Sequence, residues 1–297
     1  MTDLDNYTPR NGFLEFGSTS IKFYLVALSG ERAGEVEKEI KFPWDLGFDV
    51  FSNQHISPSS ISFCLRTLEV LSREYPDIPF EGVTAIGTAA LREAQNVEIF
   101  ERLLKDRLGL KLSIIEGGIE AFLLETGFRS SVDEFPTGLF DLGGGSLELV
   151  EYLSAHSTRK TSIPVGAIRL HCLLRRKQDI FSYIRAGRQI VIETIEEMLE
   201  RKKGSYEELI GTGGMVKAIA RALNSDEFTL QGVQNLIQEE IHGSSQSDLL
   251  PYRRRVFLPG LLVVESLYPA LGLRRVKYRP ASVKGGLISL SRLIPLG

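Results

Sequence analysis

Alternating and continuous runs of apolar residues divide the chain into segments with strand or helix character. The first three segments, 13–16, 21–28 and 35–42, are apolar or alternate polar with apolar residues around short turns, which predicts an antiparallel meander of strands. Helical and strand-like segments then alternate in the order helix 58–75, strand 82–86, helix 97–108, strand 111–115 and a helix from about residue 118.

The second half begins as the first one does. Residues 137–150 again read as strand, tight turn and strand. They are followed by a strand that ends at Ile163-Pro164, an amphipathic helix at 179–202, and a strand, glycine turn and helix start at 209–220. For the remainder we expect helices with breaks at Pro251, Pro259 and Pro280.

The opening pattern recurs at a constant offset of 126 residues, which aligns Glu15 with Asp141 and Ser20 with Ser146. In both copies an acid ends a strand, a turn of small residues follows, and a serine opens the next strand. Duplicated half-domains that face each other across a cleft would produce this repeat, although strand-turn-strand hairpins also align by chance. The pattern predicts an α/β fold of two duplicated lobes with an interdomain cleft.

Composition and charge narrow the class of protein. The 297 residues carry 35 Lys+Arg and 38 Asp+Glu, a net charge of −3, and 43% are hydrophobic, which is typical of a globular protein and excludes a polycation. The two cysteines, Cys64 and Cys172, cannot form a disulfide framework, so we expect a reducing compartment, the cytoplasm by default. The N-terminus lacks a signal-peptide pattern and the apolar run at 256–264 is too short to span a bilayer, so no membrane partner is expected.

Three small-residue turns are candidates for phosphate binding, because glycine lets a phosphate approach consecutive backbone N–H groups. The turns are Gly17, Ser18, Thr19 and Ser20; Gly143, Gly144, Gly145 and Ser146; and Gly211, Thr212, Gly213 and Gly214.

Carboxylates flank these turns and would repel a bound phosphate unless a cation lay between them. Glu15, Asp141 and Glu148 are therefore candidate ligands of Mg²⁺, which takes one or two carboxylates and shares oxygens with substrate phosphates. Asp141 could instead bond its own turn, and Glu148 could be an exposed strand residue.

Six motifs occur in the order found in the exopolyphosphatase/guanosine pentaphosphatase (Ppx/GppA) family, which the chain therefore resembles over most of its length. They are Phe13-Leu-Glu-Phe-Gly-Ser-Thr-Ser-Ile-Lys22, Thr84-Ala-Ile-Gly-Thr-Ala-Ala-Leu-Arg-Glu-Ala94, Glu116-Gly-Gly-Ile-Glu-Ala121, Asp141-Leu-Gly-Gly-Gly-Ser-Leu-Glu-Leu-Val150, Ile163-Pro-Val-Gly-Ala-Ile-Arg169 and Ile210-Gly-Thr-Gly-Gly214. The resemblance implies the short, two-domain class with actin-like, ribonuclease H-like lobes. We place these lobes at residues 1–131 and 132–297, where the last helix could pack back on the N-terminal lobe.

The resemblance also implies roles for single residues. Glu120 matches the glutamate that orients or deprotonates the attacking water, and Arg92 matches an arginine that faces the phosphate; by themselves both could be helix-surface residues. The chain departs from the family pattern in having Glu15 for an aspartate, Thr19 for an asparagine, and Glu116 where a serine is usual.

Other classes of site are excluded or weaker. The four histidines show no metal-ligand spacing, and neither a P-loop nor a Ser-His-Asp arrangement nor a nucleic-acid-binding motif is present. The main hypothesis is an Mg²⁺-dependent exopolyphosphatase that acts on inorganic polyphosphate, with hydrolysis of guanosine pentaphosphate (pppGpp) as the alternative. The departures from the family pattern leave open a regulator that binds such ligands without turnover. A sugar or acetate kinase is disfavoured by the set of motifs. The resemblance also suggests a homodimer.

Overall fold

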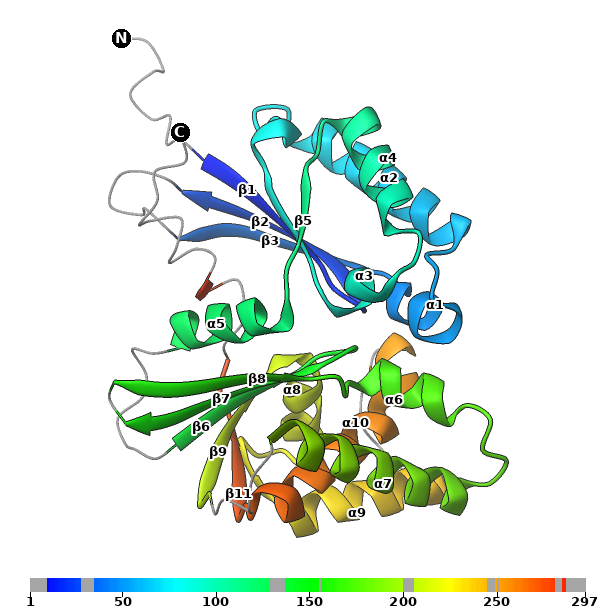
Figure 1. The fold of residues 1–297 in the computed structure, drawn as a ribbon, viewed down its shortest axis with the longest axis vertical. Helices are drawn as coiled ribbons and strands as arrows, with labels where there is room; N and C mark the ends of the chain where they lie inside the picture. The colour runs from blue at the N-terminus through cyan, green and yellow to red at the C-terminus, as the bar shows by residue number, and fades with distance from the viewer. Residues whose placement is uncertain are drawn as a thin grey trace. The chain divides into compact units, whose positions relative to one another are not determined.

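The computed structural model describes residues 10–27, 35–128, 137–154, 156–199, 206–244, 249, 251–280 and 285–286. The chain divides into two compact units, whose described parts run to Glu116 and from Gly117 to Gly286 (Figure 1). This division lies before the expected boundary at residues 131 and 132. The reason is that helix α5 (Gly117–Phe128) packs on strands of the second sheet and so belongs to the second unit. The expected return of the last helix to the first lobe concerns residues outside the described part.

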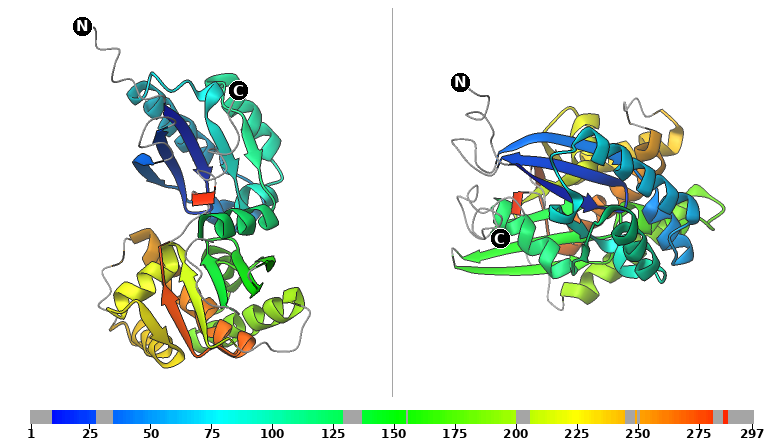
Figure 2. Two further views of the ribbon diagram at one scale, coloured as in Figure 1. Left: turned by 90° about the vertical axis from the view of Figure 1, so that its left-hand side faces the viewer. Right: turned by 90° about the horizontal axis from the view of Figure 1, so that it is seen from above.

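The first unit is built on a five-stranded sheet in the order β3-β2-β1-β4-β5. Its elements are β1 (Arg10–Phe16), β2 (Ser20–Ala27), β3 (Val36–Pro43), α1 (Leu46–Asn53), α2 (Pro58–Glu74), the 3-10 helix Phe80–Gly82, β4 (Thr84–Gly87), α3 (Ala89–Glu93), α4 (Val97–Leu108) and β5 (Leu112–Ile114). Strands β1 to β3 are antiparallel, whereas β4 and β5 run parallel to β1. Figure 2 shows α2 and α4 on the same side of this sheet, where Leu68 and Phe100 share a core with Leu14.

The second unit is built on a six-stranded sheet in the order β10-β11-β9-β6-β7-β8. Its elements after α5 are β6 (Thr137–Leu142), β7 (Leu147–Ser154), β8 (Ser157–Ile163), α6 (Ala167–Leu174), α7 (Ile180–Leu199), β9 (Glu208–Thr212), α8 (Gly213–Ala222), β10 (Glu227–Thr229), α9 (Leu230–His242), α10 (Pro251–Leu271) and β11 (Arg275–Tyr278). Helix α5 covers one face of this sheet through Ala121 and Leu124, and Figure 1 shows α7, α9 and α10 on the other side.

The two sheets confirm the predicted duplication. In each unit an antiparallel meander of three strands is followed by two strands parallel to the first, so that β8-β7-β6-β9-β11 repeats β3-β2-β1-β4-β5. The offset of 126 residues also holds in the register, because Glu15 faces Lys22 where Asp141 faces Glu148. This strand order is that of actin-like, ribonuclease H-like lobes, and the predicted α/β fold class is therefore confirmed.

The C-terminal part differs from the expectation of helices alone. Strand β11 pairs in parallel with β9, and β10 extends the sheet beyond it, so the chain returns to the sheet after α10. Pro259 was expected to break a helix but lies inside α10, as does Pro269. Burial explains this tolerance, because α10 is almost fully enclosed from Leu261 to Leu267 and packing against α7 and α9 offsets the lost backbone hydrogen bonds.

Cys64 and Cys172 are both buried free thiols. Burial raises the pKa of the Cys64 thiol, so that it stays protonated. Within the described residues, none of the helices has both the length and the apolar character that a bilayer crossing requires.

Candidate functional site

A row of polar side chains crosses the second sheet where β6 ends. Asp141 on β6 is directly opposite Glu148 on β7, Thr212 on β9 flanks Asp141, and Ser162 on β8 is opposite Glu148. Residues directly opposite each other in neighbouring strands point to the same face of a sheet. The fold therefore brings together two of the three predicted metal ligands, Asp141 and Glu148.

Helix α5 adds a third carboxylate to this row. Its residues Ala121 and Leu124 pack on Leu139 of β6, on the same sheet face as Asp141, and Glu120 lies in the first turn of the helix. Only 6% of Glu120 and 4% of Glu148 are exposed to solvent.

The buried carboxylates act on one another. Burial raises the pKa of Glu148 well above its usual range, and the negative charges of Glu120 and Asp141 raise it further. Deprotonation of this cluster is costly unless a cation approaches it, so the site favours a positively charged ligand.

Two serines orient Glu148 and oppose part of this pKa shift. The hydroxyl of Ser162 donates to Oε1 of Glu148 at 2.9 Å, and Ser146 donates a second side-chain hydrogen bond. Sequence reasoning did not identify Ser162, although it directly precedes the Ile163-Pro164 motif. The two hydrogen bonds fix the direction in which Glu148 points.

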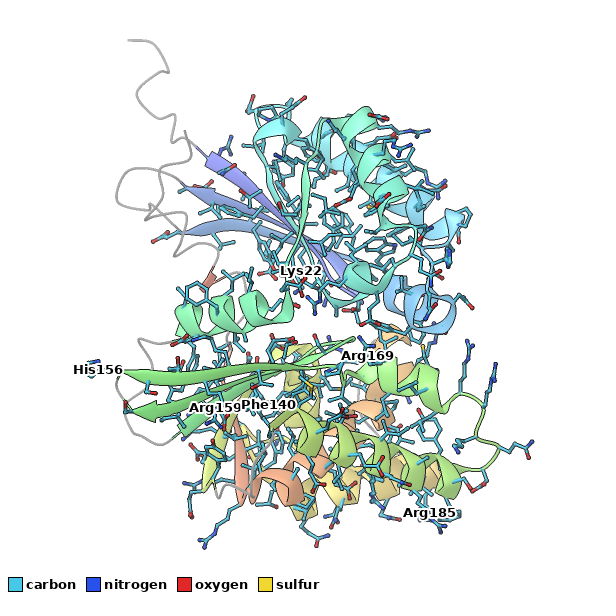
Figure 3. All side chains as sticks on the ribbon, viewed as in Figure 1. Lys22, Phe140, His156, Arg159, Arg169 and Arg185 are labelled. Atoms are coloured by element: carbon cyan, nitrogen blue, oxygen red, sulfur yellow. The ribbon has the colours of Figure 1, made fainter. Side chains whose placement is uncertain are left out.

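The carbonyl groups of the turn from Gly143 to Ser146 are held in place by hydrogen bonds. The N–H of Gly143 donates to the Ser146 carbonyl at 3.0 Å, and the first turn of α6 donates to the carbonyls of Gly143 and Gly144 at 3.1 and 2.9 Å. Arg169 completes the arrangement by donating from Nε to the Gly145 carbonyl at 2.6 Å (Figure 3). No hydrogen bond within the described chain engages the N–H groups of Gly144 and Gly145, so these donors remain for an anion.

The third glycine turn adjoins Asp141. Gly213 has a φ of +87°, and a Cβ atom there would lie 2.0 Å from Oδ1 of Asp141, so both conformation and space require glycine. The next residue, Gly214, accepts a hydrogen bond of 2.5 Å from Nη1 of Arg253. The structure thus brings the second and third predicted phosphate turns to the same acid.

The first unit repeats this hairpin with a different charge. The turn from Gly17 to Ser20 closes with the same 3.0 Å bond between N–H and carbonyl. The Ser18 carbonyl accepts from the N–H of Gly47 in α1, and the Thr19 carbonyl accepts from the N–H of Trp44, which precedes that helix. Glu15, however, is bound at both oxygens, since Lys22 (Figure 3) donates to Oε1 at 2.6 Å and the Tyr24 hydroxyl donates to Oε2 at 3.2 Å. In the register of the first sheet, Lys22 occupies the position that Glu148 occupies in the second sheet. The 126-residue repeat in the sequence already aligns these two residues, but sequence reasoning did not use that alignment.

Arg92 lies near the carboxyl end of the first sheet. Its Nη1 donates to the carbonyl of Ile115, just after β5, at 2.7 Å, which fixes the guanidinium at that end of the strands. Glu116, one residue further along the chain, is exposed. The predicted contact of Arg92 with a phosphate stays a prediction.

The donor set for Mg²⁺ consists of a carboxylate pair. Within the described residues, three or more His, Cys, Asp or Glu side chains are nowhere grouped as a metal site made by protein ligands alone. Asp141 and Glu148 nevertheless fit an ion that takes one or two carboxylates and keeps several waters. Glu15 already binds Lys22 and Tyr24, so the complete predicted set of Glu15, Asp141 and Glu148 stays a prediction.

Comparison with known proteins identifies relatives along most of the chain. The model of the Ppx/GppA phosphatase family matches residues 39–293. A guanosine-5'-triphosphate,3'-diphosphate pyrophosphatase of Photobacterium profundum is 25% identical over 295 residues, which cover 95% of this chain and 59% of that protein. The chain thus spans about three fifths of the length of that relative.

Solved structures show the same fold. An exopolyphosphatase-like protein has a TM-score of 0.79 at 19% identity, covering 96% of this chain and 99% of the other. An exopolyphosphatase from Cytophaga hutchinsonii has a TM-score of 0.75 at 17% identity, covering 97% and 100%. At such identities the similarity establishes the fold of both units and no more.

Proposed function

The chain belongs to the Ppx/GppA phosphatase family, and on that premise we propose that it hydrolyses terminal phosphoanhydride bonds, with inorganic polyphosphate as the main substrate. One observation carries the proposal: Glu148 lies opposite Asp141, its pKa is raised by burial and then by the charges of Glu120 and Asp141, and Asp141 leads directly into a turn with two N–H groups left for an anion. Acids beside an anion-binding turn are the arrangement that a metal-bound phosphate requires.

Each part of the site has a distinct task in this proposal. The N–H groups of Gly144 and Gly145 bind the terminal phosphate, and Glu120 orients the attacking water and accepts its proton. Asp141 and Glu148 would hold Mg²⁺, which supplies neutralisation of the negative charge that develops on the phosphate oxygens. Positioning and charge neutralisation provide most of the catalysis in phosphoryl transfer, so no strong nucleophile is needed.

The test is phosphate release from polyphosphate by the wild-type chain and by Glu120→Gln. We expect Glu120→Gln to reduce kcat by about 10²- to 10⁴-fold, the usual contribution of a general base. Glu98→Gln is the matched control, because Glu98 also lies in the first turn of a helix, α4, but is exposed. Equal release by the wild type and Glu120→Gln would refute the role of Glu120.

Guanosine pentaphosphate is the second candidate substrate. The relative from Photobacterium profundum is named for a guanosine polyphosphate, and both compounds present a terminal phosphate to the same site. Release measured from both compounds in parallel, with and without Mg²⁺, separates the two. Tight binding by calorimetry without release from either compound would favour the regulator that binds without turnover.

Three finer statements complete the proposal. Chelation of Mg²⁺ should abolish phosphate release if Asp141 and Glu148 hold the ion. We keep the homodimer as a prediction, to be checked by light scattering coupled to size-exclusion chromatography. The cytoplasmic location likewise rests on the two free, buried cysteines and is checked by cell fractionation.

A further inference from the structure

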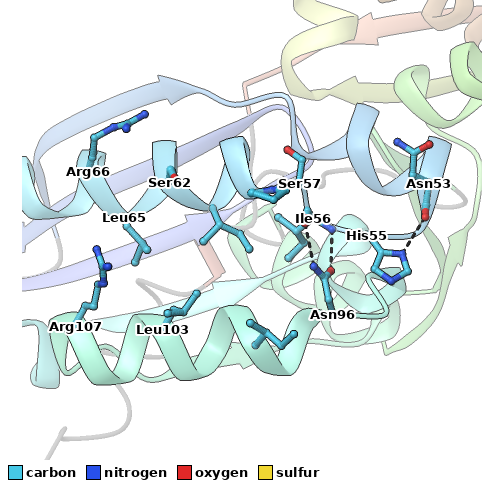
Figure 4. A pocket seen from close by; sticks show the side chains of 13 residues that line it. Asn53, His55, Ile56, Ser57, Ser62, Leu65, Arg66, Asn96, Leu103 and Arg107 are labelled. Atoms are coloured by element: carbon cyan, nitrogen blue, oxygen red, sulfur yellow. Dashed lines mark hydrogen bonds between the residues drawn. The ribbon is translucent and has the colours of Figure 1, made fainter.

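A pocket of about 710 Å³ lies between helices α2 and α4 of the first unit (Figure 4). Four aliphatic residues line it, namely Ile61 and Leu65 of α2 and Ile99 and Leu103 of α4. Ile99 is 54% exposed and leaves apolar surface open to solvent at this position. The volume falls within the range of roughly 300–1,000 Å³ that is typical of small-molecule sites.

The pocket has two arginines among its lining residues. Arg66 on α2 and Arg107 on α4 lie at the same end of the pocket, and His55 lies toward the other (Figure 4). Neither an aspartate nor a glutamate is among the lining residues. Arg107 forms a partly exposed ion pair with Glu69, at 3.7 Å between Nη1 and Oε1, a distance too long for a hydrogen bond. Within the described part of the chain, Arg66 forms no ion pair.

The wall opposite the arginines is already rigid. The amide of Asn96 accepts from the N–H of Ile56 at 2.8 Å and donates to its carbonyl at 2.9 Å, which joins the starts of α2 and α4. His55 bonds through Nδ1 to the Asn53 carbonyl at 3.0 Å. A ligand would therefore find a formed pocket rather than one that it must order, which lowers the cost of binding.

We propose that this pocket binds a small organic anion with a ring-sized apolar body and an acidic head group. The body lies on the four aliphatic residues, and the head group lies between Arg66 and Arg107, whose planar guanidinium groups match the oxygens of a phosphate or a carboxylate. None of the residues assigned to phosphoanhydride hydrolysis lines this pocket. The site is thus additional to the proposed activity and does not depend on it.

Calorimetric titration of the full chain tests the proposal with four probes. Naphthyl phosphate and naphthoate carry both features, naphthol carries only the body, and inorganic phosphate carries only the head. We expect the first two to bind at least about tenfold more tightly than the last two, because charge-assisted hydrogen bonds and apolar burial are both needed. Binding of naphthyl phosphate without naphthoate would also support the site and would identify its head group as a phosphate.

Variants locate the binding. Arg66→Gln and Arg107→Gln should each weaken the binding of naphthyl phosphate by about tenfold or more. Ser62→Phe, at an exposed lining position, should fill the pocket and abolish binding. Arg102→Gln is the matched control, since Arg102 is an exposed arginine of α4 that does not line the pocket. Because all four positions are exposed, the variants should fold, which circular dichroism verifies. Affinity for naphthyl phosphate that is equal in all variants, or no tighter than affinity for inorganic phosphate, would overturn the proposal.

Discussion

The turn from Gly143 to Ser146 depends on a close approach of two backbone segments, and Gly166→Ala tests this directly. Gly166 has an extended conformation, with φ −139° and ψ 165°, which any residue can adopt. The obstacle is space, because a Cβ atom would lie 2.5 Å from the carbonyl carbon and oxygen of Gly144. Ordinary contact begins near 3.4 Å, so the turn and the start of α6 must separate by about 0.9 Å.

Two measurements follow from this displacement. Overpacking of this kind costs about 1–3 kcal/mol, so thermal denaturation of Gly166→Ala should show a melting temperature several degrees lower. Because the displaced turn carries the N–H groups that we assign to the phosphate, kcat for phosphate release should fall about a hundredfold, as expected for a misplacement near 1 Å.

Gly118→Ala is the control for this substitution. Gly118 lies two residues before Glu120 in α5, and a Cβ atom there has open space within 4 Å. An alanine in a helix should leave phosphate release unchanged and raise stability slightly. If Gly166→Ala kept the wild-type melting temperature and kcat, the packing of α6 would not set the position of the turn, and the reasoning would be wrong.

Two further predictions concern buried carboxylates. Folding raises the pKa of Glu148, so the stability that this group contributes is present below its unfolded pKa and is lost as pH rises through its folded pKa. The melting temperature of Glu148→Gln should therefore exceed that of the wild type at about pH 8, and the difference should shrink toward about pH 4. A difference that grows toward low pH would contradict the assignment. Glu265 accepts two hydrogen bonds of 2.7 Å from Arg188, whose side chain is 42% exposed, so Glu265→Ala should cost about 1–2 kcal/mol in urea denaturation rather than the 3–5 kcal/mol of a fully buried pair. Glu207→Ala, which removes an exposed pair with Arg274, is the control and should cost less than about 1 kcal/mol; an equal loss in both variants would show that burial does not decide the difference.

Much of the fold could be predicted because local pattern and repeat agree. The meander at the start of each unit and the helices α2, α4 and α7 follow from apolar spacing, and their bounds match the structure within a few residues. The acid that ends each first strand and the small-residue turn after it are visible in the sequence, which is why Asp141 and the turn at 143–146 could be identified together.

Other features depend on contacts between distant segments. Strand β11 was missed because its four residues, Arg275–Tyr278, are too short a run for the alternation of Val276 and Tyr278 with charged residues to stand out, and the strand forms by pairing with β9. The division into units before α5 is not visible in the sequence, because the packing of α5 on β7 and β8 is a tertiary contact. The sequence did not indicate that position 166 requires glycine. The requirement arises because the backbone of Gly144 lies too close to leave space for a Cβ atom, and only the folded chain brings the two residues together.

The same backbone carries opposite charges in the two repeats, and this difference bears on where a metal is needed. In the first repeat the acid at the end of the leading strand, Glu15, is neutralised inside the protein by Lys22, directly opposite on the next strand. In the second repeat the position opposite Asp141 holds Glu148, whose pKa is raised by its burial and then by the negative charges of Glu120 and Asp141. Neighbouring carboxylates of which one is buried stay charged at a lower cost when a cation lies beside them. On this reasoning the Mg²⁺ that we propose would be needed at the second repeat, whereas the acid of the first repeat already has Lys22 as its counter-charge.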